Sequence, residues 1–344
     1  MKGFRGAPIT IILIHILAAC LRAQDVDRAP LFQDEQPLSI RLSISLQDIK
    51  KNTNDSIYFP TLLYYRNLQG SWDSIPVSVR ARGNFRRKHC FFPPMRIKIK
   101  KNDAKKTLFA GTKSLKLVLP CQTAKNYDDL ILKEYICYQL YEPTTPYVFN
   151  TRLVDISLSD TGGKNIKTHQ LKAFFIEDDD AVARRFHGKV IEADKMHPQL
   201  LQDTGSIRHD LFQYMIANTD FSTTFFHNMK IIQTNNGYYI PIAYDFDMSG
   251  FVNAPYATFY ESLGITSVRD RVYRGFCRSE KVTAFVRMEY INLEPKINEV
   301  INRYESYFDP KEFAGIKKYM NEFFTIIKND GFYRDKILRQ CRTR

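Results

Sequence analysis

Two stretches of the sequence place acids and an amide where oxygen chemistry is expected. The stretch IANTDFSTTFFHNMK carries Asp220 and Asn228, and YIPIAYDFDMSG carries Asp245 and Asp247 at the end of an apolar run. Carboxylates beside apolar neighbours are costly unless something cationic meets them. An acid that receives a hydroxyl proton, with an Asn and an Asp that hold Mg²⁺, is the minimal set for phosphoryl transfer. The alternative is an ordinary polar mouth of a hairpin.

The spacing of these residues fits a β-hairpin, MKIIQTNNGYYIPIAYDFD, with the turn at Gly237. Asn228 leads into the first strand and Asp245 ends the second. We therefore expect Asp220, Asn228 and Asp245 to converge at one end of the hairpin. Magnesium prefers hard oxygen ligands and needs few protein groups, which suits this set.

A third acid, Glu134, lies in an apolar stripe of a predicted helix, Asn126–Tyr141. An unpaired carboxylate is strongly disfavoured there, so a neighbouring cation is expected. Lys98 and Lys116 project from predicted strands upstream, and either of them could be the cation that pairs with Glu134. A strand lysine paired with a helix glutamate is the arrangement by which kinases hold nucleotide phosphates. In the alternative, Glu134 reaches solvent at the edge of its helix.

The motif RARGNFRRKHC places Gly83 and Asn84 between two predicted strands, among four arginines. Glycine at a tight turn can bring backbone N–H groups close to a phosphate. A second basic motif, VRDRVYRGFCR, follows the acidic strand and could bind an acidic acceptor or a phosphate. Both motifs are equally consistent with solvated basic loops.

The order of four motifs resembles that of the CotH-like kinases, atypical members of the protein-kinase-like fold named for a bacterial spore-coat protein. The motifs are VRARGNFRRKHCFFPPMRIKIKK, FFIEDDD, NTDFSTTFFHN and IPIAYDFDMSG. The pattern NTD…HN is also similar to the catalytic loop of HipA-type kinases. The resemblance covers roughly residues 38–257. It implies an α+β, two-lobe protein-kinase-like fold, with an antiparallel β-rich N-terminal lobe containing one helix and a mainly helical C-terminal lobe carrying a β-hairpin.

The resemblance also implies roles for residues of the N-terminal lobe. Gly83 and Asn84 would form the loop over the phosphates of ATP. Lys98, with Lys116 as competitor, would contact those phosphates, and Glu134 would support the lysine.

At the lobe junction and beyond it, the resemblance implies further roles. Glu177 would lie beside the adenine, and Asp220 would be the catalytic base. Asn228 and Asp245 would bind Mg²⁺ or Mn²⁺, and Asp247 would be a second metal ligand or a structural neighbour. The implied activity is phosphoryl transfer from a nucleotide to a hydroxyl of a cell-envelope protein or glycan.

The sequence departs from the family pattern after RGN, where a bulky and basic FRRKHCFFPP replaces a small, Ser-rich loop. A catalytically inactive kinase-like envelope module, which binds an anionic polymer or a partner protein, is therefore the alternative function. A third hypothesis, a hydrolase that uses a pair of carboxylates, has less support. Its acids would have to flank a sugar at a defined separation, and nothing in the sequence shows this.

The N-terminal segment indicates an exported protein, and the full layout resembles exported proteins of Bacteroidetes-type bacteria. Residues 1–24 combine a basic start with a short apolar run, as secretory signals do. Two processing routes remain open: cleavage near Ala23, or a lipobox that ends at Cys20 and would supply the sole membrane anchor. The predicted N-terminal lobe spans 37–178 and the C-terminal lobe 179–344. A formal net charge of +13 suits acidic partners, but no nucleic-acid-binding pattern is present.

The cysteines favour disulfides over a metal site. No CxxC or Cys/His spacing indicates zinc, and an exported protein meets oxidising conditions. Cys137 lies in the apolar helix and is expected to be a core residue. Cys90 with Cys121, and Cys277 with Cys341, are the candidate pairs.

Hydrophobic periodicity predicts a strand-rich first half and a helical second half. Strands of an antiparallel meander are expected from residue 38 to about 119, with more strands before residue 180. After that point we expect helices at 206–218, 282–308 and 310–329, with the acid-bearing hairpin among them.

Overall fold

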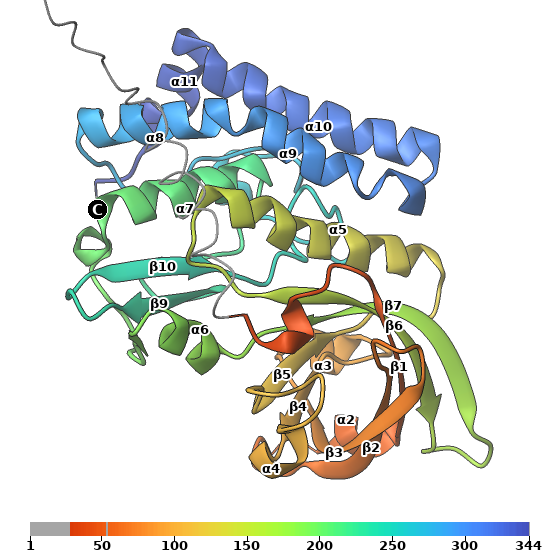
Figure 1. Cartoon of the computed structure of the whole chain (residues 1–344). Coiled ribbons are helices and arrows are strands. Elements are labelled where there is room, and N and C mark those ends of the chain that lie inside the picture. Colours follow the sequence, from red (N-terminus) through yellow and green to blue (C-terminus); the bar gives the residue numbers. More distant parts are fainter. Residues whose placement is uncertain (1–27, 53, 344) are drawn as a thin grey trace, which may run out of the picture.

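The computed structural model describes residues 28–52 and 54–343. The predicted signal segment and Cys20 lie outside the described residues. Within the described ranges, no helix has the length and apolar character needed to cross a membrane. A barrel of strands lies on one side of the molecule and a stack of helices lies on the other (Figure 1).

Seven strands close into a barrel in the order β1-β2-β3-β4-β5-β7-β6. Their bounds are β1 Leu38–Ile44, β2 Phe59–Arg66, β3 Trp72–Ala81, β4 Met95–Ile99, β5 Ser114–Val118, β6 Thr151–Asp160 and β7 Lys167–Ile176. The expected meander of β1, β3, β4 and β5 is present, and β2 was not predicted. Most neighbours pair antiparallel, as expected from short connections along the chain.

The barrel closes through a parallel pairing of β1 with β6, in which Leu38 lies opposite Val154 and Ile44 opposite Asp160. The predicted two-lobe protein-kinase-like fold, with an antiparallel β-rich N-terminal lobe, is therefore wrong. The chain instead forms a closed seven-stranded barrel with helices after it. Periodicity along one strand reports which face is buried, but it carries no information about a partner strand far along the chain.

Apolar and polar residues alternate along the strands, so aliphatic and aromatic side chains fill the interior of the barrel. In β1, Leu38, Ile40 and Leu42 are buried, whereas Arg41 is exposed. The interior forms one hydrophobic cluster that includes Phe109 and Phe175. Polar and basic side chains of the strands consequently point away from the barrel interior.

Helix α5 (Asn126–Tyr141) has the predicted bounds and packs on β7 of the barrel and on α9 (Glu294–Asn302). Every residue from Ile131 to Tyr141 is buried. A helix that is enclosed on all sides must pair any charge that it carries, so Glu134 requires a partner.

The predicted acid-bearing hairpin is confirmed. Strands β9 (Met229–Gln233) and β10 (Tyr239–Ala243) pair antiparallel, with Lys230 opposite Ile242, and β8 (Lys189–Val190) adds a third strand. Helix α7 (Asp203–Met215) packs against β10. The chain therefore leaves α7 and enters β9 through the segment that holds Asp220 and Asn228.

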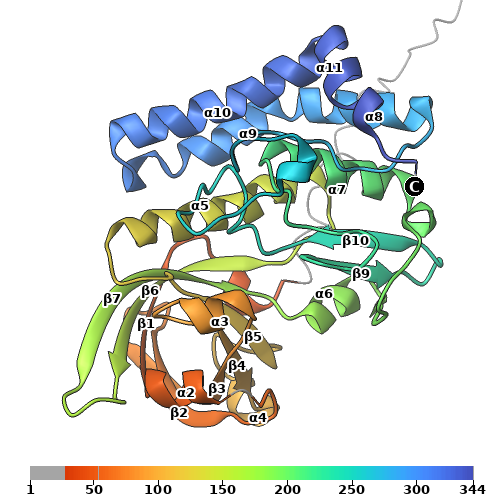
Figure 2. The ribbon, with the colours of Figure 1, turned by 180° about the vertical axis from the view of Figure 1, so that it is seen from behind.

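The C-terminal helices form the outer layer of the molecule (Figure 2). The single helix predicted at 282–308 is wrong, because α8 (Glu280–Asn292) ends before α9 begins at Glu294. Pro295 lies in the first turn of α9, where it lacks an N–H to continue α8. The predicted helix at 310–329 is confirmed as α10 (Pro310–Lys328). The shorter helices are α2 Leu46–Lys51, α3 Phe85–His89, α4 Lys101–Ala104, α6 Asp179–Arg185 and α11 Asp330–Lys336.

Both predicted disulfides are confirmed, Cys90–Cys121 and Cys277–Cys341, and Cys137 is a buried free thiol. The first disulfide joins the residue after α3 to the segment after β5. Because α3 has only five residues, this covalent link holds it against the barrel.

Candidate active site

A cavity of about 320 Å³ lies where the loop after β3 meets the segment after α7 and the end of β10. The residues that line it are Arg82, Gly83, Asn84, Phe85, Arg86, Pro94, Asp220, Phe226, His227, Asn228, Tyr244, Asp245, Asp247 and Met248. The predicted convergence of Asp220, Asn228 and Asp245 is thus present. Gly83 and Asn84 reach the same cavity from the barrel.

Asp220 is held by the two residues that close its loop. The Asn228 side-chain nitrogen donates to the Asp220 carboxylate at 2.9 Å and to its main-chain carbonyl at 2.7 Å. The His227 ring nitrogen lies 3.1 Å from the other carboxylate oxygen. In the described part of the chain, the Asn228 side-chain oxygen has no hydrogen-bond donor, so it remains available as a ligand.

The backbone around the cavity is strained at residues that carry side chains. The φ angles are +50° at Asn228, +66° at Asp245, +54° at Phe226 and +49° at Ala217. Such left-handed conformations are uncommon for residues other than glycine and cluster at functional sites. Asp245 is kept in this conformation by its backbone N–H, which donates to the Tyr138 hydroxyl of α5 at 2.9 Å.

Glu134 meets an arginine, and its predicted pairing with Lys98 or Lys116 is wrong. The Arg86 guanidinium lies 3.3 Å from the Glu134 carboxylate and 3.8 Å from that of Asp247. All three side chains are at least nine-tenths buried. Arg86 also donates to the main-chain carbonyl of Leu119, which anchors it to the end of β5.

One guanidinium faces more carboxyl groups than it can neutralise. Burial, reinforced by Asp247, raises the pKa of Glu134 to about 8 against the attraction of Arg86. Burial also raises the pKa of Asp247 to about 6, reinforced by Asp245. One oxygen of Glu134 and the Nε of Arg86 are buried without a hydrogen-bond partner among the described residues. The cluster therefore retains an affinity for additional positive charge.

Gly83 and Asn84 form the turn between β3 and α3. Gly83 has a φ of +79°, which glycine adopts without strain, and a Cβ added there would meet nothing within 4 Å. The turn is thus open toward the cavity. Arg82 and Arg86 flank it, so an anion at this turn would meet positive charge on both sides.

The other predicted nucleotide-binding residues lie apart from this cavity. Lys116 forms an ion pair with Asp179, and burial lowers the pKa of Lys116 to about 8 despite that attraction. Lys98 and Glu177 line a different cavity on the outer face of the barrel. Glu177 is engaged by Arg185 at 3.0 Å.

The donors around the cavity fit a divalent cation held with help from a ligand. The described residues contain no group of three His, Cys, Asp or Glu side chains arranged to hold a metal ion. Asp245, Asn228 and Asp220 nevertheless supply hard oxygen atoms. Magnesium commonly takes one or two carboxylates from the protein and further oxygens from bound phosphates.

His227 and Tyr256 were not predicted as site residues, and Arg86 was predicted only as one of four arginines near the turn at Gly83. Arg86 belongs to the run FRRKH, whose basic character predicts a solvated surface. Only the disulfide after α3 could have indicated that one arginine of this run is turned inward. Tyr256 is a further hydrogen-bond partner of the Asp247 carboxyl and is partly buried.

No protein-family model matches the chain, and a search of curated proteins finds no significant match.

Proposed function

We propose that the protein transfers a phosphoryl group from a nucleotide to a hydroxyl group in the cavity around Asp220, Asn228 and Asp245. The observation that carries the proposal is their convergence from two separate segments, with Asn228 and Asp245 in strained backbone conformations. Strain of this kind costs about 1–3 kcal/mol per residue and persists where the site requires it.

Each residue has a definite part in the proposed reaction. The acceptor hydroxyl oxygen forms a bond to the terminal phosphorus of the nucleotide, the bond to the leaving phosphate oxygen breaks, and the hydroxyl proton passes to the Asp220 carboxylate. His227 and Asn228 orient that carboxylate. Arg82 and the turn at Gly83 bind the phosphates.

ATP with Mg²⁺ or Mn²⁺ is the proposed cofactor pair, and Asn228 and Asp245 would hold the cation. When bound, a divalent cation neutralises charge on the phosphates. The excess carboxyl groups around Arg86 support this proposal, because they favour additional positive charge nearby.

The proposed acceptor is a hydroxyl of a cell-envelope protein or glycan, because residues 1–24 have the pattern of an export signal. Membership of the CotH-like kinases is likewise a proposal. It rests on the order of the motifs alone, since the barrel differs from the fold that the resemblance implies.

A catalytically inactive module that binds an anionic polymer or a partner protein is the second candidate. The ion pairs of Arg86 with Glu134 and Asp247 favour it, because they already satisfy part of the acidic cluster. In this function the basic surface binds the partner, and Asp245 and Asp220 are structural.

Incubation of the purified protein with labelled ATP, Mg²⁺ or Mn²⁺ and a casein-like acceptor separates the two functions. The wild type should label itself or the acceptor, and Asp220→Ala and Asp245→Asn should each abolish the labelling while remaining folded. Asp194→Asn is the matched control, because Asp194 is exposed and does not line the cavity. Labelling that survives in both site variants, or that is absent from the wild type, would overturn the proposed transfer.

A further inference from the structure

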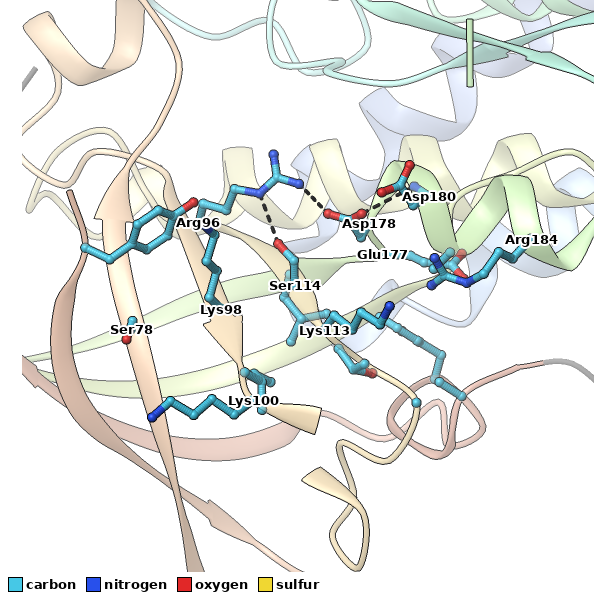
Figure 3. Close-up of a pocket in the computed structure, with 18 residues that line it drawn as sticks. Ser78, Arg96, Lys98, Lys100, Lys113, Ser114, Glu177, Asp178, Asp180 and Arg184 are labelled. Atoms are coloured by element: carbon cyan, nitrogen blue, oxygen red, sulfur yellow. Dashed lines mark hydrogen bonds and ion pairs between the residues drawn. The ribbon is translucent and has the colours of Figure 1, made fainter. Parts of the chain in front are cut away.

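A larger cavity, of about 670 Å³, lies on the outer face of β4 and β5 beside α6. Figure 3 shows its side chains reaching from the barrel strands on one side and from the crossing into α6 on the other. Its volume falls within the range of about 300–1,000 Å³ typical of small-molecule sites. No residue of the proposed active site lines it.

Three lysines of the barrel supply positive charge to this cavity without a carboxylate partner. Lys98, Lys100 and Lys113 line it, and none of them forms an ion pair within the described ranges. Lys98 lies 4.1 Å above the ring of Tyr58, an aromatic contact that leaves its ammonium free to donate to an anion. The barrel side of the cavity is therefore suited to a phosphate, sulfate or carboxylate group.

The opposite side of the cavity carries acceptors for hydroxyl groups. Asp180 lines it without a cation partner in the described part of the chain. Asp178 is also there, fixed by Arg96, and Arg96 is itself held 3.0 Å from the Ser114 hydroxyl (Figure 3). Carboxylates accept hydrogen bonds from neutral hydroxyls but repel anions, so the two sides favour different parts of one ligand.

The lining of the cavity also includes partly exposed apolar groups. These are Ala29, Ala181 and the ring of Tyr58, whereas the side chains of Leu115 and Ile99 are buried in the barrel. A sugar ring has an apolar C–H face between polar edges, and it can pack on such a surface while its substituents reach both sides.

We propose that this cavity binds an anionic saccharide, with its acidic group on Lys98, Lys100 and Lys113 and its hydroxyls on Asp180 and Asp178. A phosphorylated, sulfated or uronic-acid sugar carries the required chemistry. The formal net charge of +13 favours approach of such ligands from solution.

Calorimetric titration of the full chain with glucose 6-phosphate, glucuronic acid, glucose and inorganic phosphate tests the proposal. We expect the two anionic sugars to bind more tightly than glucose or phosphate alone. In the variant Lys98→Ala/Lys100→Ala/Lys113→Ala, affinity for the anionic sugars should fall by about tenfold or more, the loss expected for charge-assisted hydrogen bonds.

The matched control is Lys164→Ala/Lys281→Ala/Lys318→Ala, which removes the same charge from exposed positions outside the cavity. This control should bind the anionic sugars as the wild type does. Asp180→Asn should weaken binding of both anionic sugars while leaving binding of inorganic phosphate unchanged. Equal losses in the two triple-lysine variants, equal affinity for phosphate and sugar phosphate, or no binding of either anionic sugar would overturn the proposal. Each of these measurements is independent of phosphoryl transfer. A negative result would therefore contradict the saccharide site without contradicting the proposed function.

Discussion

The Asn228 side-chain nitrogen donates to both the main-chain carbonyl and the carboxylate of Asp220, at 2.7 Å and 2.9 Å. The two residues lie at opposite ends of one loop, and this double contact closes the loop beside the cavity. The contact also leaves the Asn228 side-chain oxygen directed away from Asp220. A single amide can thus position one acid and serve as a ligand at the same time.

Replacement of Asn228 by alanine should abolish the effect of ATP with Mg²⁺ on thermal stability. The substitution removes a ligand oxygen and leaves Asp220 without its donor. Loss of the partner of a partly buried carboxylate should also lower the free energy of unfolding by about 1–3 kcal/mol. Denaturant titration and thermal shift with and without nucleotide measure both effects. The control Asn321→Ala, on the exposed side of α10, should change neither quantity. A normal nucleotide response in Asn228→Ala would contradict the assigned ligand role.

Arg86→Met should destabilise the protein severely. It leaves Glu134 and Asp247 buried without a cation, a change that typically costs about 3–5 kcal/mol. The neighbouring Arg87→Met should cost less than about 1 kcal/mol, because the sole ion-pair partner of Arg87 among the described residues is the exposed Asp55.

The double variant Arg86→Met/Glu134→Gln distinguishes an ion pair from lost packing. At pH 9, above the pKa of about 8 at which Glu134 ionises, removal of its charge should restore part of the stability, which gives a favourable coupling energy in a double-mutant cycle. Additive losses in the cycle would show that Arg86 acts through its packing and not through its charge.

Stability should depend on pH through Glu134. Its pKa is raised by burial from the model-peptide value of 4.5 to about 8 in the folded chain, so the native state binds this proton more tightly than the unfolded state. The resulting stabilisation is complete below the unfolded pKa and is lost as pH rises toward 8. Glu134→Gln should flatten this part of the profile, whereas Glu305→Gln, at an exposed position, should not. Melting temperatures between pH 5 and 9 provide the measurement, and parallel profiles for wild type and Glu134→Gln would contradict the assignment.

Local patterns predicted the elements that carry the site but not the fold that holds them. The helical spacing around Glu134 and the turn at Gly237 depend on neighbours in sequence, so α5 and the hairpin were predictable. The parallel pairing of β1 with β6 joins segments that are distant in the chain, and it alone distinguishes a closed barrel from an open sheet. Similarly, nothing in FRRKH marks Arg86 as buried, because tertiary packing decides which basic side chain turns inward.

Removal of the disulfide by Cys90→Ala/Cys121→Ala should lower the free energy of unfolding. The bond closes a loop across a separation of 31 residues, for which the chain-entropy relation gives about 3–4 kcal/mol. It should also weaken nucleotide binding, since the bond secures α3, which places Arg86 beside the acids. The control is Cys277→Ala/Cys341→Ala, which removes the disulfide of the C-terminal part of the chain. It should leave nucleotide binding intact. Equal effects of the two double variants on nucleotide affinity would show that Cys90–Cys121 contributes stability alone.

Substitutions of Asp245 should separate an effect on nucleotide binding from an effect on stability. Its φ of +66° is unfavourable for a residue with a Cβ and is unstrained for glycine. Asp245→Gly should therefore be more stable than Asp245→Ala by about 1 kcal/mol, as measured by denaturant titration. Both variants should lose the thermal shift caused by ATP with Mg²⁺, because neither retains the carboxylate. If glycine brought no advantage over alanine, the backbone at this position would not be strained. If Asp245→Gly kept the nucleotide response, the carboxylate would have no part in binding, and the conformation would have to be explained by the hydrogen bond from its N–H to Tyr138.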